Sequence, residues 1–182
     1  METQFERYHP DDAALSKAQG RSEGVCFVCN LVAQHDAGES PVHIVYEDEA
    51  TIAFLDPYPR RYGYTLVAPR EHRVLATGDF TLQEYLDLHR IVYGVSEAVR
   101  REVGAERMYI LTLGSNQGNA HVHWHVVPLP PGIPFEQQQN VGWRLGVLRI
   151  PDPEMASLAA RLGLRLREDG NSAFQEGPFA RR

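Results

Sequence analysis

The chain has 182 residues, 43% hydrophobic and 23% charged, which is enough apolar material for one compact domain without disulfide support. Its formal net charge of -6, with no block of Lys or Arg, argues against long nucleic acid as the main partner. No apolar stretch approaches the roughly 20 residues that span a bilayer. The polar start at 1–10 has no signal-peptide pattern, so we expect a cytoplasmic protein with no membrane partner.

The N-terminal part of the chain contains its only two cysteines. Residues 1–23 are polar and predict an extension with a short helix near 11–19. Cys26 and Cys29 then form a C-x-x-C unit, which in a cytoplasmic chain indicates a metal site, a redox pair or a coincidence. A thioredoxin-like pair would lie where a strand leads into a helix, which the surrounding residues do not indicate. Two thiols cannot complete a tetrahedral zinc site, so zinc requires two further ligands from elsewhere.

Five strands are expected from β-rich runs between turn signals. They lie at 43–46, 51–54, 64–68, 108–113 and 121–127. An acidic turn after the first run predicts a hairpin between the first two strands. The proline-rich stretch 128–134 is expected to end the last strand.

Two longer helices are expected. Apolar residues recur at helical spacing from Asp79, which is the predicted N-cap, to about Val103, and Gly104 is a suitable C-terminal stop. Asp152, followed by a proline and an acid, predicts the start of a C-terminal helix that runs to about Leu166.

This order of elements predicts an α+β fold. Hairpin-linked strands with added helices favour a mostly antiparallel sheet, covered on one face by the long helix. We expect an N-terminal extension at 1–23, the domain itself at 24–134, and a C-terminal extension with one helix at 135–182.

The chemistry-bearing pattern is a row of histidines in the last predicted strand. His121, His123 and His125 occupy alternate positions, so their imidazoles share one face while the apolar residues between them pack under the long helix. The row indicates either a metal site or attack on phosphorus by a neutral ring nitrogen, with the flanking histidines binding phosphate oxygens. The strand offers no carboxylate, which hydrolytic metal sites usually add. A solvent-exposed polar face is the remaining interpretation.

The histidine row and two upstream segments resemble a known family. Residues 118–128, Gly-Asn-Ala-His-Val-His-Trp-His-Val-Val-Pro, resemble the signature of the histidine triad (HIT) nucleotide-binding superfamily. Residues 45–57 are similar to the nucleotide-pocket hairpin of that family, and 62–72 to its next strand. Tyr64 replaces the histidine that usually follows the glycine in this strand, and Gly118 stands where the phosphoramidase branch has a serine.

The resemblance implies a role for each matching residue. His123 would be the nucleophile that forms a nucleotidyl-enzyme intermediate, and His121 and His125 would orient and bind phosphate. Asp56 would hold the ribose hydroxyls. The residues around the base would be Phe54, Tyr46 and Pro57, and the phosphate donors of the polar turn would be Ser115, Asn116, Gln117 and Asn119.

Structural explanations compete with these binding roles. Asp56 precedes a proline and is also a typical turn residue, and Phe54 and Tyr46 are equally suited to the core. Ser115 and Asn116 could serve only to form the turn.

The resemblance also implies zinc. Many bacterial HIT proteins with an N-terminal C-x-x-C bind the metal, and the four corresponding residues here are Cys26, Cys29, His72 and His121. A Cys2His2 set suits a closed structural site and would make His121 a ligand rather than a free catalytic group. The alternative is a pair of buried thiols beside a surface histidine.

The expected function is hydrolysis or transfer at the α-phosphate of a purine nucleotide conjugate or a dinucleoside polyphosphate. The alternatives are a nucleotide-binding regulatory protein with weak turnover, and a metal-dependent hydrolase that uses the histidines as ligands. The resemblance further implies a homodimer.

Overall fold

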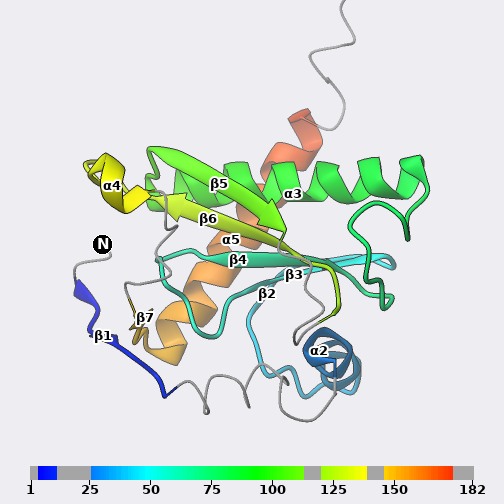
Figure 1. Ribbon diagram of the computed structural model, residues 1–182, viewed down its shortest axis with the longest axis horizontal. Coiled ribbons are helices and arrows are strands. Elements are labelled where there is room, and N and C mark those ends of the chain that lie inside the picture. The colour runs from blue at the N-terminus through cyan, green and yellow to red at the C-terminus, as the bar shows by residue number, and fades with distance from the viewer. Residues whose placement is uncertain (1–3, 12–25, 113–119, 139–145, 174–182) are drawn as a thin grey trace, which may run out of the picture.

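The computed structural model describes residues 4–11, 26–112, 120–138 and 146–173. Its centre is a five-stranded antiparallel sheet in the order β2-β3-β4-β6-β5 (Figure 1). The strands are β2 (Ile44–Glu47), β3 (Thr51–Leu55), β4 (Thr65–Pro69), β5 (Arg107–Thr112) and β6 (Trp124–Leu129). The predicted α+β fold with a mostly antiparallel sheet is confirmed. None of the described helices is long and apolar enough to cross a membrane.

The predicted hairpin is formed by β2 and β3. Asp48 closes its turn, because the carboxylate Oδ1 accepts hydrogen bonds from the backbone N–H groups of Ala50 and Thr51, at 2.8 and 2.6 Å. A β-bulge between Ile44 and Tyr46 shifts the register of the pair, so that Tyr46 lies opposite Ala53. The bulge therefore moves Tyr46 to the other face of the sheet from Ile44.

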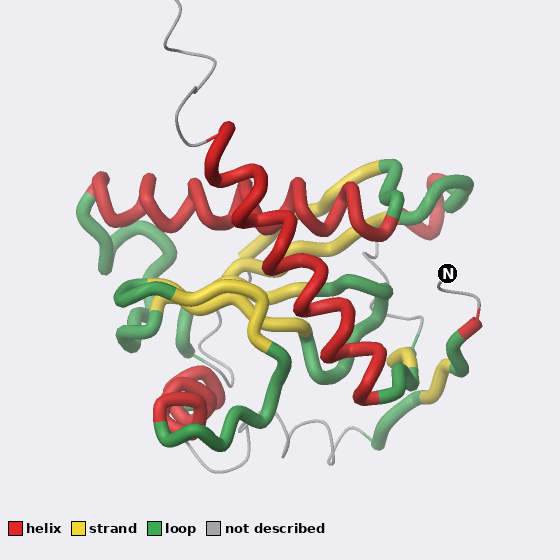
Figure 2. The backbone as a smooth tube through the Cα atoms, turned by 180° about the vertical axis from the view of Figure 1, so that it is seen from behind, coloured by secondary structure: helices red, strands yellow, loops and turns green. Residues whose placement is uncertain are grey.

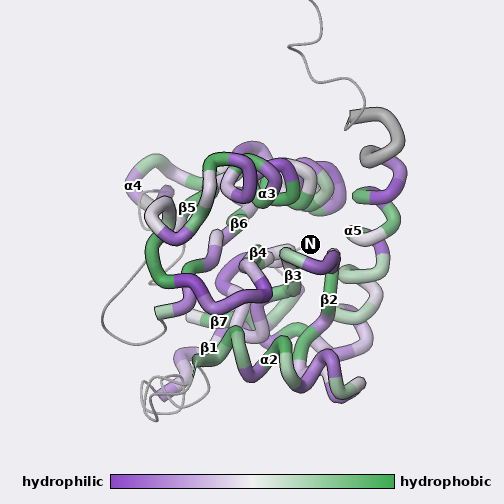
Figure 3. Tube along the Cα trace, turned by 90° about the vertical axis from the view of Figure 1, so that its right-hand side faces the viewer, coloured by the Kyte–Doolittle hydropathy of each residue, from purple (hydrophilic) through white to green (hydrophobic). Residues whose placement is uncertain are grey.

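Two long helices cover one face of the sheet, α3 (Leu82–Val103) and α5 (Asp152–Ala173). Seen from behind, α5 crosses the strands diagonally, and α3 runs along the upper edge of the sheet (Figure 2). The side view also places α5 next to the sheet (Figure 3). Leu158 and Leu162 of α5 are fully buried in the same core as Val95 and Val99 of α3. The C-terminal helix therefore belongs to the main core, and it extends beyond the predicted end at Leu166.

The N-terminus of α3 differs from the prediction. Thr81 is the N-cap, and a capping box joins it to Glu84, with each side chain bonded to the other residue's backbone N–H. Asp79 instead accepts hydrogen bonds from the backbone N–H groups of Val74 and Leu75, at 2.7 and 2.8 Å, and so shapes the preceding loop. Gly104 ends the helix in the left-handed conformation, with φ 67°, as predicted.

A helix that the sequence analysis did not predict, α2 (Phe27–Asp36), covers part of the opposite face. Val28 and Leu31 are its buried residues, and they pack in a second apolar cluster that contains Phe54 of β3. Two buried positions give only a weak periodic signal, which explains why the helix was missed. Cys26 is its N-cap.

The histidine strand is shorter at its start and longer at its end than predicted. β6 begins at Trp124, so His121 and His123 lie in the extended segment before it. That segment is attached to the loop after β4 by the backbone hydrogen bond from Val122 N–H to the Arg73 carbonyl, at 2.7 Å. Pro128 lies within β6 rather than ending it. The pairing of β6 with β4 stops at Val126, so the proline lies where β6 has no partner on that side.

A small second sheet is formed by β1 (Arg7–Tyr8), near the start of the chain, and β7 (Val147–Leu148), just before α5. It contacts the loop between β3 and β4: Leu148 N–H donates to the Pro59 carbonyl at 2.8 Å, and Arg7 donates to the Arg60 carbonyl at 3.0 Å.

A short helix, α4 (Phe135–Gln138), follows β6. The helix expected near 11–19 lies, apart from Asp11, outside the described residues.

Candidate functional site

The histidine row is divided between two environments. His123 and His125 lie next to each other, with ring centroids 4.7 Å apart. His121 is 1% exposed and its ring lies against His72, at a centroid distance of 5.1 Å. The apolar residues between the histidines, among them Trp124, pack in the core with α3, as the alternation predicts.

His123 is held in one tautomer by the backbone. Its Nδ1 lies 2.8 Å from the carbonyl oxygen of His121, and a carbonyl can only accept, so Nδ1 carries the proton. Burial lowers the pKa of His123, although the bond to the His121 carbonyl opposes this change, so the ring is neutral at pH 7. The second nitrogen, Nε2, therefore has a lone pair and can act as a nucleophile.

His125 contacts a tyrosine from the neighbouring strand. The Tyr64 hydroxyl lies 2.9 Å from Nδ1 of His125. Burial, together with the charges of His123 and Arg60, lowers the pKa of His125 to about 3. His125 is therefore also neutral at physiological pH.

Asp56 follows β3 directly and is nearly buried, with 9% exposure. Its carboxylate Oδ1 accepts a hydrogen bond from Tyr58 N–H at 2.8 Å, and its own N–H donates to the Tyr64 carbonyl at 2.9 Å. Burial raises the pKa of Asp56, while the Tyr58 bond and the charge of Arg60 oppose the rise. The turn role of Asp56 is thus present in the structure, and it uses only one of the two carboxylate oxygens.

Arg60 is a functional candidate that the sequence analysis missed. It lies in the loop after Asp56, and its charge lowers the pKa values of Asp56, Tyr64 and His125, so the guanidinium lies close to all three. A half-buried cation beside the histidines suits a phosphorylated ligand. The sequence does contain a signal for this residue. Arg60 and Arg61 form a basic pair only a few residues after Asp56, in a chain whose net charge is negative.

The expected base-binding residues are not brought together. Phe54 is fully buried on the α2 face, with the Phe27 ring at a centroid distance of 6.3 Å. Tyr46 packs against the core on the α3–α5 face, and its hydroxyl donates to Asp48. Pro57 is exposed and lines a hollow of about 170 Å³. The proposed phosphate donors of the polar turn, Ser115, Asn116, Gln117 and Asn119, lie outside the described residues.

A hollow of about 680 Å³ lies away from the histidines. It is on the α3–α5 face, and its lining combines five carboxylates, among them Glu71 and Glu84, with the guanidinium groups of Arg73 and Arg90. The carboxylates outnumber the arginines and repel phosphate, so we place the candidate nucleotide site at the histidines rather than in this hollow.

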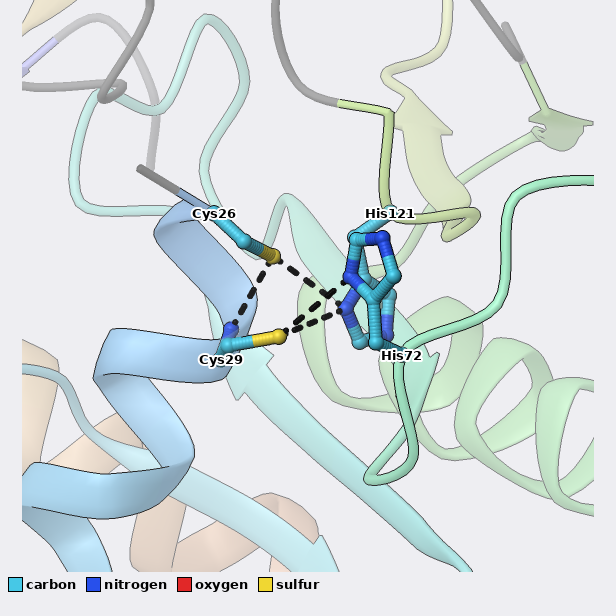
Figure 4. Close-up of side chains that lie close together, drawn as sticks. All are labelled: Cys26, Cys29, His72 and His121. Carbon is cyan, nitrogen blue, oxygen red and sulfur yellow. Dashed lines mark hydrogen bonds between the residues drawn. The ribbon is translucent and has the colours of Figure 1, made fainter. Parts of the chain in front are cut away.

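The four predicted metal ligands converge, although they come from three separate segments (Figure 4). Their ligand atoms all lie within 4.8 Å of one another. His121 Nδ1 is 3.3 Å from the sulfur of Cys26 and 3.5 Å from that of Cys29, and His72 Nδ1 is 3.4 Å from the sulfur of Cys29. Sulfur and nitrogen ligands of one tetrahedral zinc would be about 3.5 Å apart. The spacing of this cluster therefore fits zinc.

The protonation pattern of the cluster also fits a cation. His121 Nε2 lies 2.8 Å from the Pro69 carbonyl, so Nε2 carries the proton and Nδ1 presents a lone pair to the sulfurs. Burial lowers the pKa of His121 to about 4. Burial, the hydrogen bond with Cys26 and the charge of Cys26 raise the pKa of the Cys29 thiol to about 11, so this thiol keeps its proton when no cation is present. A divalent metal would supply the missing positive charge.

Comparisons with known proteins show the family to which the chain belongs. The family model described as "HIT domain" matches residues 37–131. An uncharacterised HIT-like protein of Mycobacterium tuberculosis is 34% identical over 145 residues, which are 76% of this chain and 92% of that protein. The adenosine 5′-monophosphoramidase of Schizosaccharomyces pombe is 29% identical over 121 residues, which are 65% of this chain and 82% of that protein.

Solved structures show the same fold. The crystal structure of a zinc-bound histidine triad family protein from Mycobacterium smegmatis matches with a TM-score of 0.61 and 25% identity, and the match covers 81% of this chain and 97% of that one. A hypothetical histidine triad nucleotide-binding protein from Sulfolobus tokodaii matches with a TM-score of 0.62 and 22% identity, over 78% of this chain and 94% of that one. At 22% identity the second likeness concerns the fold alone.

Proposed function

The chain belongs to the HIT family, and from this premise we propose that it hydrolyses or transfers the nucleotidyl group of a purine nucleotide conjugate or dinucleoside polyphosphate. The observation that carries the proposal is the state of His123. Its Nδ1–H is bonded to the His121 carbonyl, and its neutral Nε2 is left as a nucleophile. The monophosphoramidase of Schizosaccharomyces pombe supports a nucleotide substrate.

The proposed reaction has two steps. In the first step, the lone pair of His123 Nε2 forms a bond to the α-phosphorus. The bond from phosphorus to the leaving group breaks at the same time. The leaving group departs with the electron pair of that bond and takes up a proton. The His121 carbonyl stabilises the imidazolium that forms, because it accepts the bond from Nδ1–H. Water then attacks phosphorus and loses a proton, the nitrogen–phosphorus bond breaks, and His123 returns to its neutral form.

We also propose that Cys26, Cys29, His72 and His121 hold a zinc ion. When bound, the ion would link α2, the loop after β4 and the histidine segment, and its function would be structural. His121 is then a metal ligand, and its contribution to catalysis is to position His123 through its carbonyl. The zinc-bound relative from Mycobacterium smegmatis supports this proposal.

A homodimer is part of the same proposal. β5 is an edge strand of the sheet, and its Ile110 is 48% exposed. Tyr93 on the neighbouring α3 is 61% exposed. Exposed apolar residues beside an unpaired strand edge are suited to pairing with a second copy of the chain.

The test of the proposed function is a panel of adenylated substrates with mass detection of the products. The panel contains an adenosine phosphoramidate, a dinucleoside polyphosphate and a mixed anhydride of AMP. We expect release of AMP, or of its phosphorylated form if phosphate is the acceptor, from at least one class. We also expect a rapidly quenched reaction to contain a peptide with a nucleotidyl group on His123. Turnover without this adduct, even under single-turnover conditions, would contradict the covalent mechanism.

The role of Asp56 can be tested with sugar analogues. Asp56→Ala should raise KM for ribonucleotide substrates more than for their 2′,3′-dideoxy analogues, because only the ribonucleotides lose a hydrogen-bond acceptor. A difference on the order of tenfold is expected for the loss of such a bond. Equal increases for both substrates would show that Asp56 serves only the turn it forms with Tyr58.

A further inference from the structure

We propose that Tyr64 is a positioning residue that fixes His125 in the tautomer with the proton on Nε2, so that His125 donates a hydrogen bond to a phosphoryl oxygen of the substrate. This inference rests on the proposed function and adds a specific role for the tyrosine that replaces the usual histidine. Tyr64 immediately precedes β4, and Thr65 pairs with Val126 of β6, so the sheet register sets the tyrosine beside His125.

Burial determines which partner donates in the hydrogen bond between the Tyr64 hydroxyl and His125 Nδ1. Tyr64 is 4% exposed, and among the described residues the hydrogen-bond partner of its hydroxyl is Nδ1 of His125, at 2.9 Å. A buried hydroxyl proton without an acceptor is more costly than an unused oxygen lone pair, so the hydroxyl donates. Nδ1 must then be unprotonated. Because the His125 ring is neutral, its proton is on Nε2.

The tautomer of each of the three histidines is therefore set by a different partner, and His123 alone of the three carries its proton on Nδ1. In His121, Nε2–H donates to the Pro69 carbonyl and Nδ1 faces the cysteines. In His123, Nδ1–H donates to the His121 carbonyl and Nε2 has a lone pair. In His125, the Tyr64 hydroxyl donates to Nδ1, so the proton is on Nε2, opposite to the tautomer of His123. The Nε2–H donor of His125 therefore lies next to the nucleophilic ring of His123, with the two ring centroids 4.7 Å apart.

The lone pair of His123 and the neighbouring N–H donor of His125 are together complementary to a phosphoryl group. The His123 nitrogen can approach phosphorus while the His125 Nε2–H binds an oxygen that gains charge as the bond forms. A tyrosine holds this arrangement more firmly than a histidine would. The phenol has one proton and burial raises its pKa, so it stays a donor across the physiological range, whereas an imidazole can donate or accept.

The primary test reads the tautomer directly in the full-length protein. Side-chain nitrogen-15 NMR, with the His125 signals assigned by their loss in His125→Gln, should show Nε2–H in the unmodified chain. Added AMP should shift this Nε2–H signal, because the phosphate accepts from it. An Nδ1–H tautomer, or a signal that AMP does not move, would overturn the proposal. The tautomer measurement in the unmodified chain requires neither turnover nor nucleotide binding, so its failure is distinct from failure of the proposed function.

The kinetic test uses Tyr64→Phe with Tyr62→Phe as a matched control. Tyr62 is equally buried, but its hydroxyl bonds to Glu154 and Arg161 on α5. Tyr64→Phe should allow both tautomers of His125. It should also lower kcat by roughly 10- to 100-fold with little change in KM, because the His125 Nε2–H donor acts mainly on charge that develops in the transition state. Tyr62→Phe should leave the tautomer and kcat unchanged. An equal loss of kcat in both variants would mean that Tyr64 only stabilises the fold.

Discussion

His123→Asn is expected to lower kcat on the order of 10³-fold or more while the melting temperature and the affinity for AMP stay close to those of the unmodified protein. Asparagine keeps a polar side chain of similar size beside the His121 carbonyl, but it has no basic nitrogen with a lone pair that can attack phosphorus. The large loss follows because the His123 nitrogen itself forms the covalent bond to phosphorus.

The matched control for this variant is His89→Asn. His89 lies on α3, across Trp124 from the histidine row, with its Nδ1 bonded to the Tyr85 carbonyl. This change should leave kcat within a few-fold of the unmodified value. Near-normal kcat in His123→Asn would show that the covalent mechanism is wrong. A comparable loss in both variants would point to a general disturbance of the sheet.

The second large effect concerns the metal. Purified protein should contain about one zinc per chain, and Cys29→Ser should release it. Because the four ligands come from three distant segments, metal binding is coupled to folding, and its loss should lower the melting temperature by about 5–10 °C. Some turnover should remain, since His123 uses its own lone pair and not the metal. Metal content by mass spectrometry, melting curves and the adenylate assay provide the three measurements.

The control for the cysteine variant is Asn30→Ser, which changes an exposed neighbour on the same helix and should keep both zinc and stability. A metal-free protein with an unchanged melting temperature would show that the cluster is no zinc site. Loss of all turnover on mild chelation, with recovery after zinc is added back, would instead favour a metal-dependent hydrolase.

The parts of the protein that depend on local pattern could be predicted from the sequence. Alternation along a strand placed His123 and His125 on the face opposite Trp124, because side-chain direction has a period of two. Apolar spacing located α3, and the left-handed conformation of Gly104 ended it where a glycine was expected. Helix α2 was missed because its buried stripe has only two residues, too few for a periodic signal.

The four metal ligands were predicted by resemblance, but their convergence is a property of the folded chain. The bulge after Ile44 is not visible in the sequence, yet it turns Tyr46 away from the face that holds Phe54. A regular hairpin would have placed both on one face, and a shift of a single residue reverses the side-chain direction. The contact between Tyr64 and His125 likewise joins residues 61 positions apart. Such contacts depend on strand register and packing between distant segments, which local patterns do not specify, so only the tertiary structure decided them.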